Sequence, residues 1–186
     1  MKETTRKGRN EKKKIGCWNV GGLKKKTLDR EIIEYLKTFH VIGLLETWVF
    51  GDNGVEIQGF KSIAKQSFKK GFRGRKAGGL NVLIKESKEI KYEVIKNLLR
   101  ETIWLKVNLG GEKLLLCFAY VQPENSVYFR KGIMKEIELE ANKINRENSE
   151  YSILMLGDFN ARTGRKTGEI VDEWNDFNLE VNSFFE

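Results

Sequence analysis

The residues with types and spacing suited to chemistry follow one apolar segment near the end of the chain. Residues 153–156 form an apolar run that Gly157 ends, and Asp158, Phe159 and Asn160 come next. Such a run is typical of a buried strand, and the loops after such strands often carry functional side chains. If strand geometry continues through Asn160, Asp158 and Asn160 project to one side and Phe159 points into the core. The side that carries Asp158 and Asn160 would then be a functional site. Gly, Asp and Asn are also the usual turn formers, so a simple turn stays open as the alternative.

A second carboxylate follows another apolar strand. Val41–Leu45 is a continuous apolar run, and Glu46 comes directly after it. Burying an unpaired carboxylate is costly, and a divalent cation is one good partner for it. A hard oxygen donor of this kind suits magnesium. The alternative is an exposed glutamate at a strand end.

Two further polar residues are predicted to lie at strand ends. Residues 15–20 alternate in the pattern of a short strand that carries Asn19 outward at its end, although an Asn before two glycines also forms turns. The apolar segment Glu112–Val121 is predicted to be a central strand that delivers Tyr120. A phenol there can donate a hydrogen bond to a phosphate oxygen, or it can simply be a half-buried strand tyrosine.

These stretches resemble motifs of the endonuclease/exonuclease/phosphatase superfamily, and they are most similar to the endonuclease domains of non-LTR retrotransposons. Five motifs agree in order and approximate spacing: IGCWNVGGL at 15–23, VIGLLETW at 41–48, AGGLNVLI at 77–84, LLLCFAYVQPENS at 114–126 and GDFNAR at 157–162. Together they extend the resemblance over nearly all of the chain from Lys14 onward. The alternation of strands and helices predicts the α/β class. The resemblance implies a two-sheet β-sandwich flanked by helices on both outer faces.

The resemblance also implies a reaction, which is the magnesium-dependent hydrolysis of a DNA phosphodiester. Glu46 would hold Mg²⁺, or Mn²⁺ in its place, and Asn19 would support the metal and its shell. Asp158 would orient or deprotonate the attacking water, and Asn160 and Tyr120 would hold phosphate oxygens. Two other activities stay open, a nucleic-acid-binding remnant without catalysis and a sister phosphatase that acts on inositol phosphates or lipids.

The sequence departs from the family pattern in two places. Gln122 stands where the YxPP-like motif often has a proline. The SDH-like motif with its catalytic histidine does not occur before Glu186, and His40, the only histidine, matches no catalytic position. His40 is predicted to be structural.

We therefore expect a domain that is incomplete at its C-terminus and impaired in catalysis. Residues 1–14 are predicted to be a disordered basic tail, and residues 15–186 to be the N-terminal two-thirds of one domain. The chain would be a truncated or degenerate copy or an incomplete gene model. A reverse transcriptase region in a longer parent polypeptide is the partner that the resemblance implies.

The charge of the chain favours an acidic partner. The formal net charge is +8, and the positive residues gather in the first fourteen positions, in Lys24–Lys26 and in Lys61–Lys76. We expect DNA as the partner, although a charge run is commonly just a solvated face. The predicted phosphate contacts are Arg162, Lys24, Arg75 and Lys76.

Composition also sets aside several classes of protein. No apolar run approaches the roughly 18 residues of a membrane helix, and the first residues contain no hydrophobic signal segment. We expect a soluble intracellular protein without a membrane partner, and a nuclear location is open. Cys17 and Cys117 lack the spacing of zinc ligands or of a disulfide framework and are predicted to be buried.

Periodicity predicts the remaining elements. A helix capped by Thr27 is expected to run to Phe39, and a second helix capped by Ser126 to reach Ile144. The other expectations are a long loop over Gly51–Lys76, a strand Leu80–Ile84, paired strands Val94–Leu109 and Glu112–Val121 around Gly110–Gly111, an amphipathic piece with Val171, Trp174 and Phe177, and a last strand from Leu179.

Overall fold

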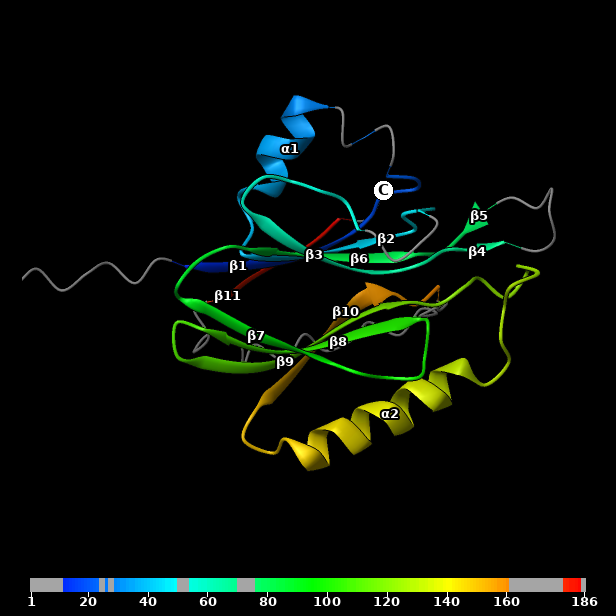
Figure 1. The fold of residues 1–186 in the computed structure, drawn as a ribbon. Coiled ribbons are helices and arrows are strands. Elements are labelled where there is room, and N and C mark those ends of the chain that lie inside the picture. The colour runs from blue at the N-terminus through cyan, green and yellow to red at the C-terminus, as the bar shows by residue number, and fades with distance from the viewer. Residues whose placement is uncertain are drawn as a thin grey trace, which may run out of the picture.

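Two β-sheets stacked face to face form the centre of the molecule (Figure 1). The structure, a computed structural model, describes residues 12–23, 26, 29–49, 54–69, 76–160 and 179–184, and it gives the backbone alone at 68–69, 76 and 179–184. The first sheet has the order β11 (Leu179–Phe184), β1 (Lys13–Asn19), β2 (Val41–Leu45), β6 (Leu80–Lys85), β3 (Phe60–Lys65). The second has the order β10 (Ser152–Asp158), β9 (Glu112–Tyr120), β8 (Thr102–Leu109), β7 (Ile90–Ile95). A small pair, β4 (Phe68–Lys69) and β5 (Lys76–Ala77), lies apart from both.

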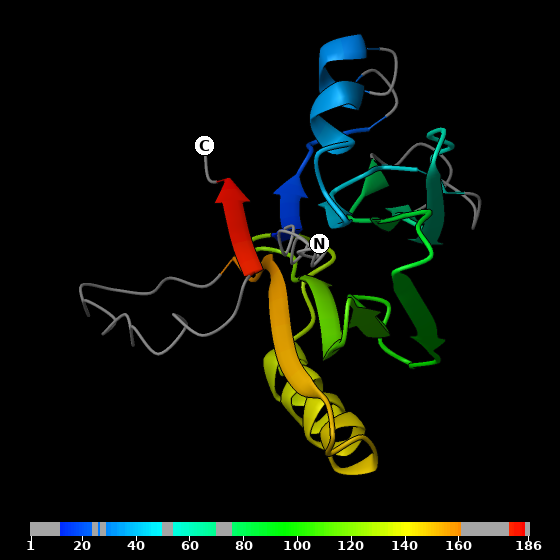
Figure 2. The same ribbon diagram turned by 90° about the vertical axis from the view of Figure 1, so that its left-hand side faces the viewer.

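Two helices cover the outer faces of the sandwich (Figures 1 and 2). Helix α1 (Arg30–Leu36) connects the parallel strands β1 and β2, and α2 (Ile133–Glu147) connects the parallel strands β9 and β10. Parallel neighbours require such a crossover, and burying the apolar stripe of each helix against its sheet makes the crossover stable. The predicted sandwich with helices on both outer faces is therefore confirmed.

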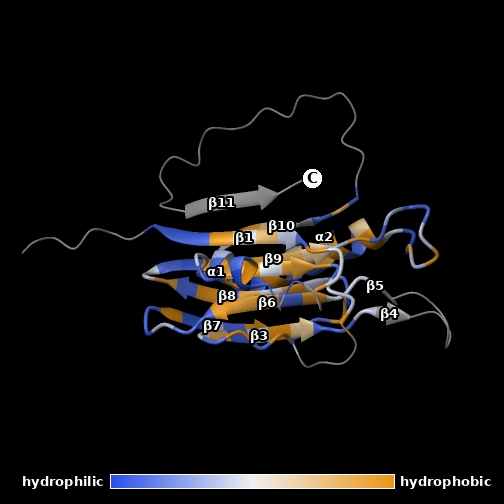
Figure 3. Ribbon diagram, turned by 90° about the horizontal axis from the view of Figure 1, so that it is seen from above, coloured by the Kyte–Doolittle hydropathy of each residue, from blue (hydrophilic) through white to orange (hydrophobic). Residues whose placement is uncertain are grey.

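The main core lies between the two sheets. Every residue of β2 is buried, and so are the last seven residues of β9. Side chains from both sheets meet there, including Val41, Leu45, Leu105 and Phe118. Seen from the α1 side, hydrophobic residues concentrate along the strands, and hydrophilic ones gather toward strand ends and loops (Figure 3). Continuous apolar runs are the expected pattern for strands that are covered on both faces.

Both helices begin later than the sequence predicts. The residue that caps α1 is Asp29, whose carboxylate accepts hydrogen bonds from the backbone N–H groups of Glu31 at 2.9 Å and Ile32 at 3.4 Å. The predicted cap at Thr27 is therefore wrong, because the acceptor that satisfies the first helical N–H groups comes from Asp29.

The predicted cap of the second helix, Ser126, is also wrong. Helix α2 starts after Gly132, whose φ is 84°. Ser126 accepts a hydrogen bond from the backbone N–H of Tyr128 at 3.2 Å, so its hydroxyl stabilises a turn in the loop before the helix. Phe129, expected on the helix, packs against the helix from this loop.

Several strand boundaries also differ. The region Gly51–Lys76, predicted to be a loop, contains β3, which pairs antiparallel with β6. The predicted strand Val94–Leu109 is two strands, β7 and β8. Strand β1 begins at Lys13, so Lys13 and Lys14 belong to the sheet. The amphipathic piece expected at 171–177 lies outside the described residues.

The hairpin, the inner position of its second strand and the burial of both cysteines are confirmed. Strands β8 and β9 form a hairpin around Gly110 and Gly111, and β9 lies inside its sheet. Cys17 and Cys117 are buried and free, and burial raises the pKa of Cys17 to about 12. No helix in the described part of the chain is long and apolar enough to cross a membrane.

His40 has a structural role, as predicted. Its Nδ1 accepts a hydrogen bond from the backbone N–H of Lys14 at 3.0 Å, and its carbonyl accepts one from Lys85 at 2.9 Å. It directly precedes β2, whereas Glu46 directly follows the same strand. His40 and Glu46 therefore lie at opposite ends of the sheet.

Candidate active site

Four strand ends bring the predicted polar residues together. Strands β1 and β2 run parallel in one sheet, and β9 and β10 run parallel in the other, with Asp158 beside Tyr120 in the register. Two hydrogen bonds then join the sheets. The Nδ2 group of Asn19 donates to Oδ2 of Asp158 at 2.9 Å, and the hydroxyl of Tyr120 donates to Oε1 of Glu46.

These contacts change the expected partner of Asn19. The resemblance implies that Asn19 supports the metal at Glu46, whereas in the structure its amide nitrogen contacts Asp158. Its Oδ1 accepts from the backbone N–H of Gly21 at 3.2 Å, which fixes the orientation of the amide. Asn19 therefore both forms the turn and orients a carboxylate.

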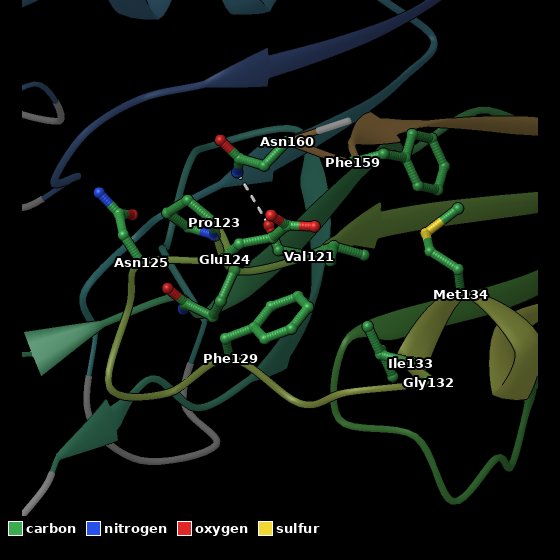
Figure 4. Close-up of a pocket in the computed structure, with 11 residues that line it drawn as sticks. Val121, Pro123, Glu124, Asn125, Phe129, Gly132, Ile133, Met134, Phe159 and Asn160 are labelled. Atoms are coloured by element: carbon green, nitrogen blue, oxygen red, sulfur yellow. Dashed lines mark hydrogen bonds between the residues drawn. The ribbon is translucent and has the colours of Figure 1, made fainter. Parts of the chain in front are cut away.

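Asp158 and Asn160 likewise combine a turn with a polar site. Strand β10 ends at Asp158, and Asn160 has a φ of 45°, so strand geometry does not continue through it. The backbone N–H of Asn160 donates to Oδ1 of Asp158 at 3.0 Å, and its Nδ2 donates to the carbonyl of Val121 at 2.8 Å (Figure 4). Phe159 packs into the apolar clusters beneath α2, as predicted.

Glu46 occupies a strained stretch of backbone. Its φ is 52° and that of Trp48 is 54°, and non-glycine residues with positive φ are uncommon and cluster at functional sites. The stretch is held on both sides, because the carbonyl of Glu46 accepts from Gly22 at 2.8 Å and the N–H of Thr47 donates to Gly79 at 3.2 Å. Gly79 has a φ of 90°, and a Cβ there would lie 2.6 Å from Oγ1 of Thr47. Hydrogen bonds to neighbouring loops thus fix the backbone that carries Glu46.

Sequence reasoning missed one residue that supports the site. Glu101 is 5% exposed, and its carboxylate pairs with Arg130 through contacts of 3.1 and 2.9 Å. Its carbonyl accepts from the backbone N–H of Tyr120 at 2.9 Å. Glu101 therefore holds the end of β9 in place, and no sequence motif marks it because its partners come from two separate segments.

Tyr120 is held in its neutral form. It is 3% exposed, and burial raises its pKa well above the usual value near 10. Its hydrogen bond to Glu46 and the negative charges of Glu46 and Asp158 raise the pKa further, while Asn160 opposes the shift. The phenol is therefore a hydrogen-bond donor throughout the physiological range.

This shift predicts a pH-dependent contribution to stability. The folded-state pKa of Tyr120 is raised, so its stabilising effect is complete below the unfolded pKa near 10 and is lost as the pH rises above it. Tyr120→Phe removes the hydrogen bond to Glu46 and is expected to cost about 1 kcal/mol at pH 8. Urea unfolding of both proteins should show this difference shrinking between pH 8 and pH 11. A difference that stays constant would contradict the raised pKa.

One carboxylate oxygen at this site could hold a cation. Within the described residues no group of three or more His, Cys, Asp and Glu side chains could hold a metal. Tyr120 engages Oε1 of Glu46, and both oxygens of Asp158 accept hydrogen bonds. Oε2 of Glu46 accepts none in the described part of the chain and is the atom best suited to a cation. Mg²⁺ commonly binds through one or two carboxylates and keeps several waters, which suits this arrangement.

The predicted basic contacts are not placed by the structure. Arg162, Lys24 and Arg75 lie outside the described residues. Lys76 is described by its backbone in β5 alone. All four therefore stay predictions.

Solved structures show the same fold. No protein-family model matches the chain, and no curated protein matches it significantly. Truncated TDP2 of Caenorhabditis elegans is 16% identical, with 80% of this chain and 62% of that one covered and a TM-score of 0.51. The human Nocturnin catalytic domain with a bound sulfate anion is 13% identical, with 78% and 62% covered and a TM-score of 0.51. The endonuclease domain of TRAS1, a telomere-specific non-LTR retrotransposon, is 14% identical, with 79% and 58% covered and a TM-score of 0.50.

These similarities establish the fold, which is that of the endonuclease/exonuclease/phosphatase superfamily. The chain spans 58 to 62% of the length of these three structures.

Proposed function

We propose that this chain carries the site of a magnesium-dependent phosphodiesterase that nicks DNA. The observation that carries the proposal is the hydrogen-bonded cluster at the shared end of the two sheets, where Asn19 contacts Asp158 and Tyr120 contacts Glu46. A carboxylate free to bind a cation, a second carboxylate held in one orientation and a neutral phenol are suited to the hydrolysis of a phosphodiester. The fold shared with the TRAS1 endonuclease domain supports the same reaction class.

Each residue has a distinct role in the proposed reaction. Asp158, oriented by Asn19 and by the N–H of Asn160, would accept a proton from the attacking water. The water oxygen bonds to phosphorus and the bond from phosphorus to the sugar oxygen breaks in line, while the leaving oxygen takes a proton from solvent. When the substrate binds, the hydroxyl of Tyr120 would turn from Glu46 to a phosphate oxygen, and the side-chain amide of Asn160 would donate to a second one. Glu46 would hold Mg²⁺, which when bound neutralises phosphate charge.

The substrate is proposed to be the backbone of DNA. The net charge of +8 favours a polyanion over a small neutral substrate. Arg162, Lys24, Arg75 and Lys76 are the proposed contacts to phosphates flanking the cleaved bond. Contacts of this kind are largely independent of sequence.

Nicking of supercoiled plasmid by the purified chain tests this function. We expect slow, magnesium-dependent conversion of supercoiled to open-circular plasmid, with duplex DNA competing better than small phosphoesters. Stronger competition by inositol phosphates would favour the phosphatase alternative. A folded chain that binds DNA without nicking it would favour the binding remnant.

Magnesium is expected to stabilise the folded chain through Glu46. A ligand that binds only the folded state raises the free energy of unfolding, by about 2.7 kcal/mol at one hundred times its Kd. Thermal unfolding should therefore shift upward on titration with MgCl₂ for the wild type and not for Glu46→Gln. Glu150→Gln, an exposed loop variant, is the matched control and should respond like the wild type. An equal shift for Glu46→Gln would place the metal elsewhere.

A further inference from the structure

A cavity of about 820 Å³ lies directly beside the proposed site (Figure 4). It is bounded by the loop after β9, the first residues of α2 and the end of β10, and its lining includes Val121, Gln122, Phe129, Ile133, Phe159 and Asn160. Asn160 belongs to both places, because it lines the cavity and contacts Asp158. A molecule in the cavity would therefore lie next to the bond that is cleaved.

The walls of the cavity suit a flat ring. Phe129 and Phe159 are half-buried, and Val121 and Ile133 add further apolar surface. Ligand cavities of about 300–1,000 Å³ with apolar and aromatic walls and few polar groups are typical of small-molecule sites. Aromatic side chains are also the usual stacking partners of bases.

One polar group in the lining has an unmet hydrogen bond. Gln122 is 6% exposed, and its buried Nε2 donates to no partner among the described residues. Its Oε1 accepts from the hydroxyl of Ser126 at 3.3 Å, and Nε2 is the donor left without a partner. An unsatisfied buried donor is costly, and a turn of the amide toward an acceptor bound in the cavity would satisfy it.

The surrounding charges favour a neutral acceptor over an anion. Glu124 lines the cavity and brings a negative charge to it. The nearby guanidinium of Arg130 is already paired with Glu101 and Glu136. A phosphate would therefore meet repulsion there, whereas a nucleobase is neutral, flat and rich in oxygen and nitrogen acceptors.

We propose that the cavity receives the base of a nucleotide adjacent to the cleaved phosphodiester. The base stacks on Phe129 or Phe159 and accepts a hydrogen bond from Nε2 of Gln122 once the amide turns toward the cavity. This inference rests on the proposed function, because it places the base of that substrate. It makes Gln122 a residue that binds the substrate's base and contributes to specificity.

Titration with the four deoxynucleosides, which carry no phosphate, tests the inference without metal or cleavage. Met134 lines the cavity, so its methyl group in [¹³C-methyl]methionine-labelled protein reports binding by NMR. We expect the Met134 signal to shift on titration with at least one deoxynucleoside. Gln122→Leu should weaken that binding about tenfold while thermal stability is kept or raised, because it removes an unsatisfied buried donor. Gln66→Leu, at an exposed position, is the matched control.

Phe129→Ala provides a second variant, and it should also weaken binding severalfold. Asp158→Asn should bind deoxynucleosides like the wild type. No shift of Met134 with any deoxynucleoside, or equal affinity for Gln122→Leu and the wild type, would overturn the inference. Deoxynucleoside binding in a protein that never nicks DNA would support the base site while removing the proposed nuclease function.

Discussion

Asp158→Asn is expected to lower magnesium-dependent nicking about a thousandfold or more. Asp158 is the carboxylate that two neighbours orient, through Nδ2 of Asn19 at 2.9 Å and the N–H of Asn160 at 3.0 Å. An asparagine keeps the shape of the side chain but cannot accept a proton from water at neutral pH. Loss of one member of a set of groups that acts as a unit typically costs several orders of magnitude in rate.

Plasmid nicking under single-turnover conditions measures this loss, with circular dichroism to confirm that the variant is folded. Glu150→Gln, an exposed carboxylate after α2, should nick at the wild-type rate. Equal nicking rates for the wild type and Asp158→Asn would show that Asp158 takes no part in the reaction. Equal rates would also indicate that a contaminating nuclease cleaves the plasmid.

Phe118→Ala is expected to destabilise the fold by about 3–5 kcal/mol, the usual range for truncating a buried aromatic ring. Phe118 is fully buried between the sheets, and its ring lies against Gly43 of β2. A loss of this size is a large fraction of the 5–15 kcal/mol that stabilises a typical domain. Urea unfolding followed by circular dichroism gives the free energy directly. A loss under 1 kcal/mol would mean that the sheets do not pack at this position.

Gly43→Ala provides a complementary test of the same contact. A Cβ at Gly43 would lie 2.1 Å from Cδ1 of Phe118, so the substitution alone should cost about 1–3 kcal/mol. In a Phe118→Leu background the added methyl group meets a smaller side chain, and its cost should fall. Additive costs would show that the two residues are not in contact.

Strands with a continuous apolar run could be predicted from the sequence, although β10, expected to be central, lies at the edge of its sheet and is mostly half-buried. The run at 153–156 and Val41–Leu45 are examples, and both were predicted and found. Strand β3 was missed because it reads FKSIAK, with its residues only half-buried or exposed at the edge of the sheet. Edge strands of this kind have few apolar residues, and their lysines favour the prediction of a loop.

The members of the site cluster could be predicted, but not how they pair. Asn19 contacts Asp158 across 139 positions of sequence, and this contact depends on how one sheet stacks on the other. Periodicity describes each strand alone and contains nothing about that stacking. The unmet donor of Gln122 could not be predicted either, because whether an atom finds a hydrogen-bond partner depends on how the folded molecule packs.

The two hydrogen bonds at the site have a mechanical consequence. Asn19 ends β1 and Glu46 follows β2 in one sheet, and their partners Asp158 and Tyr120 end strands of the other. A shear of one sheet over the other would therefore separate both pairs at once. A misplacement of about 1 Å can slow an enzyme a hundredfold. Variants in which the sheets slide would therefore cleave more slowly even while they remain fully folded.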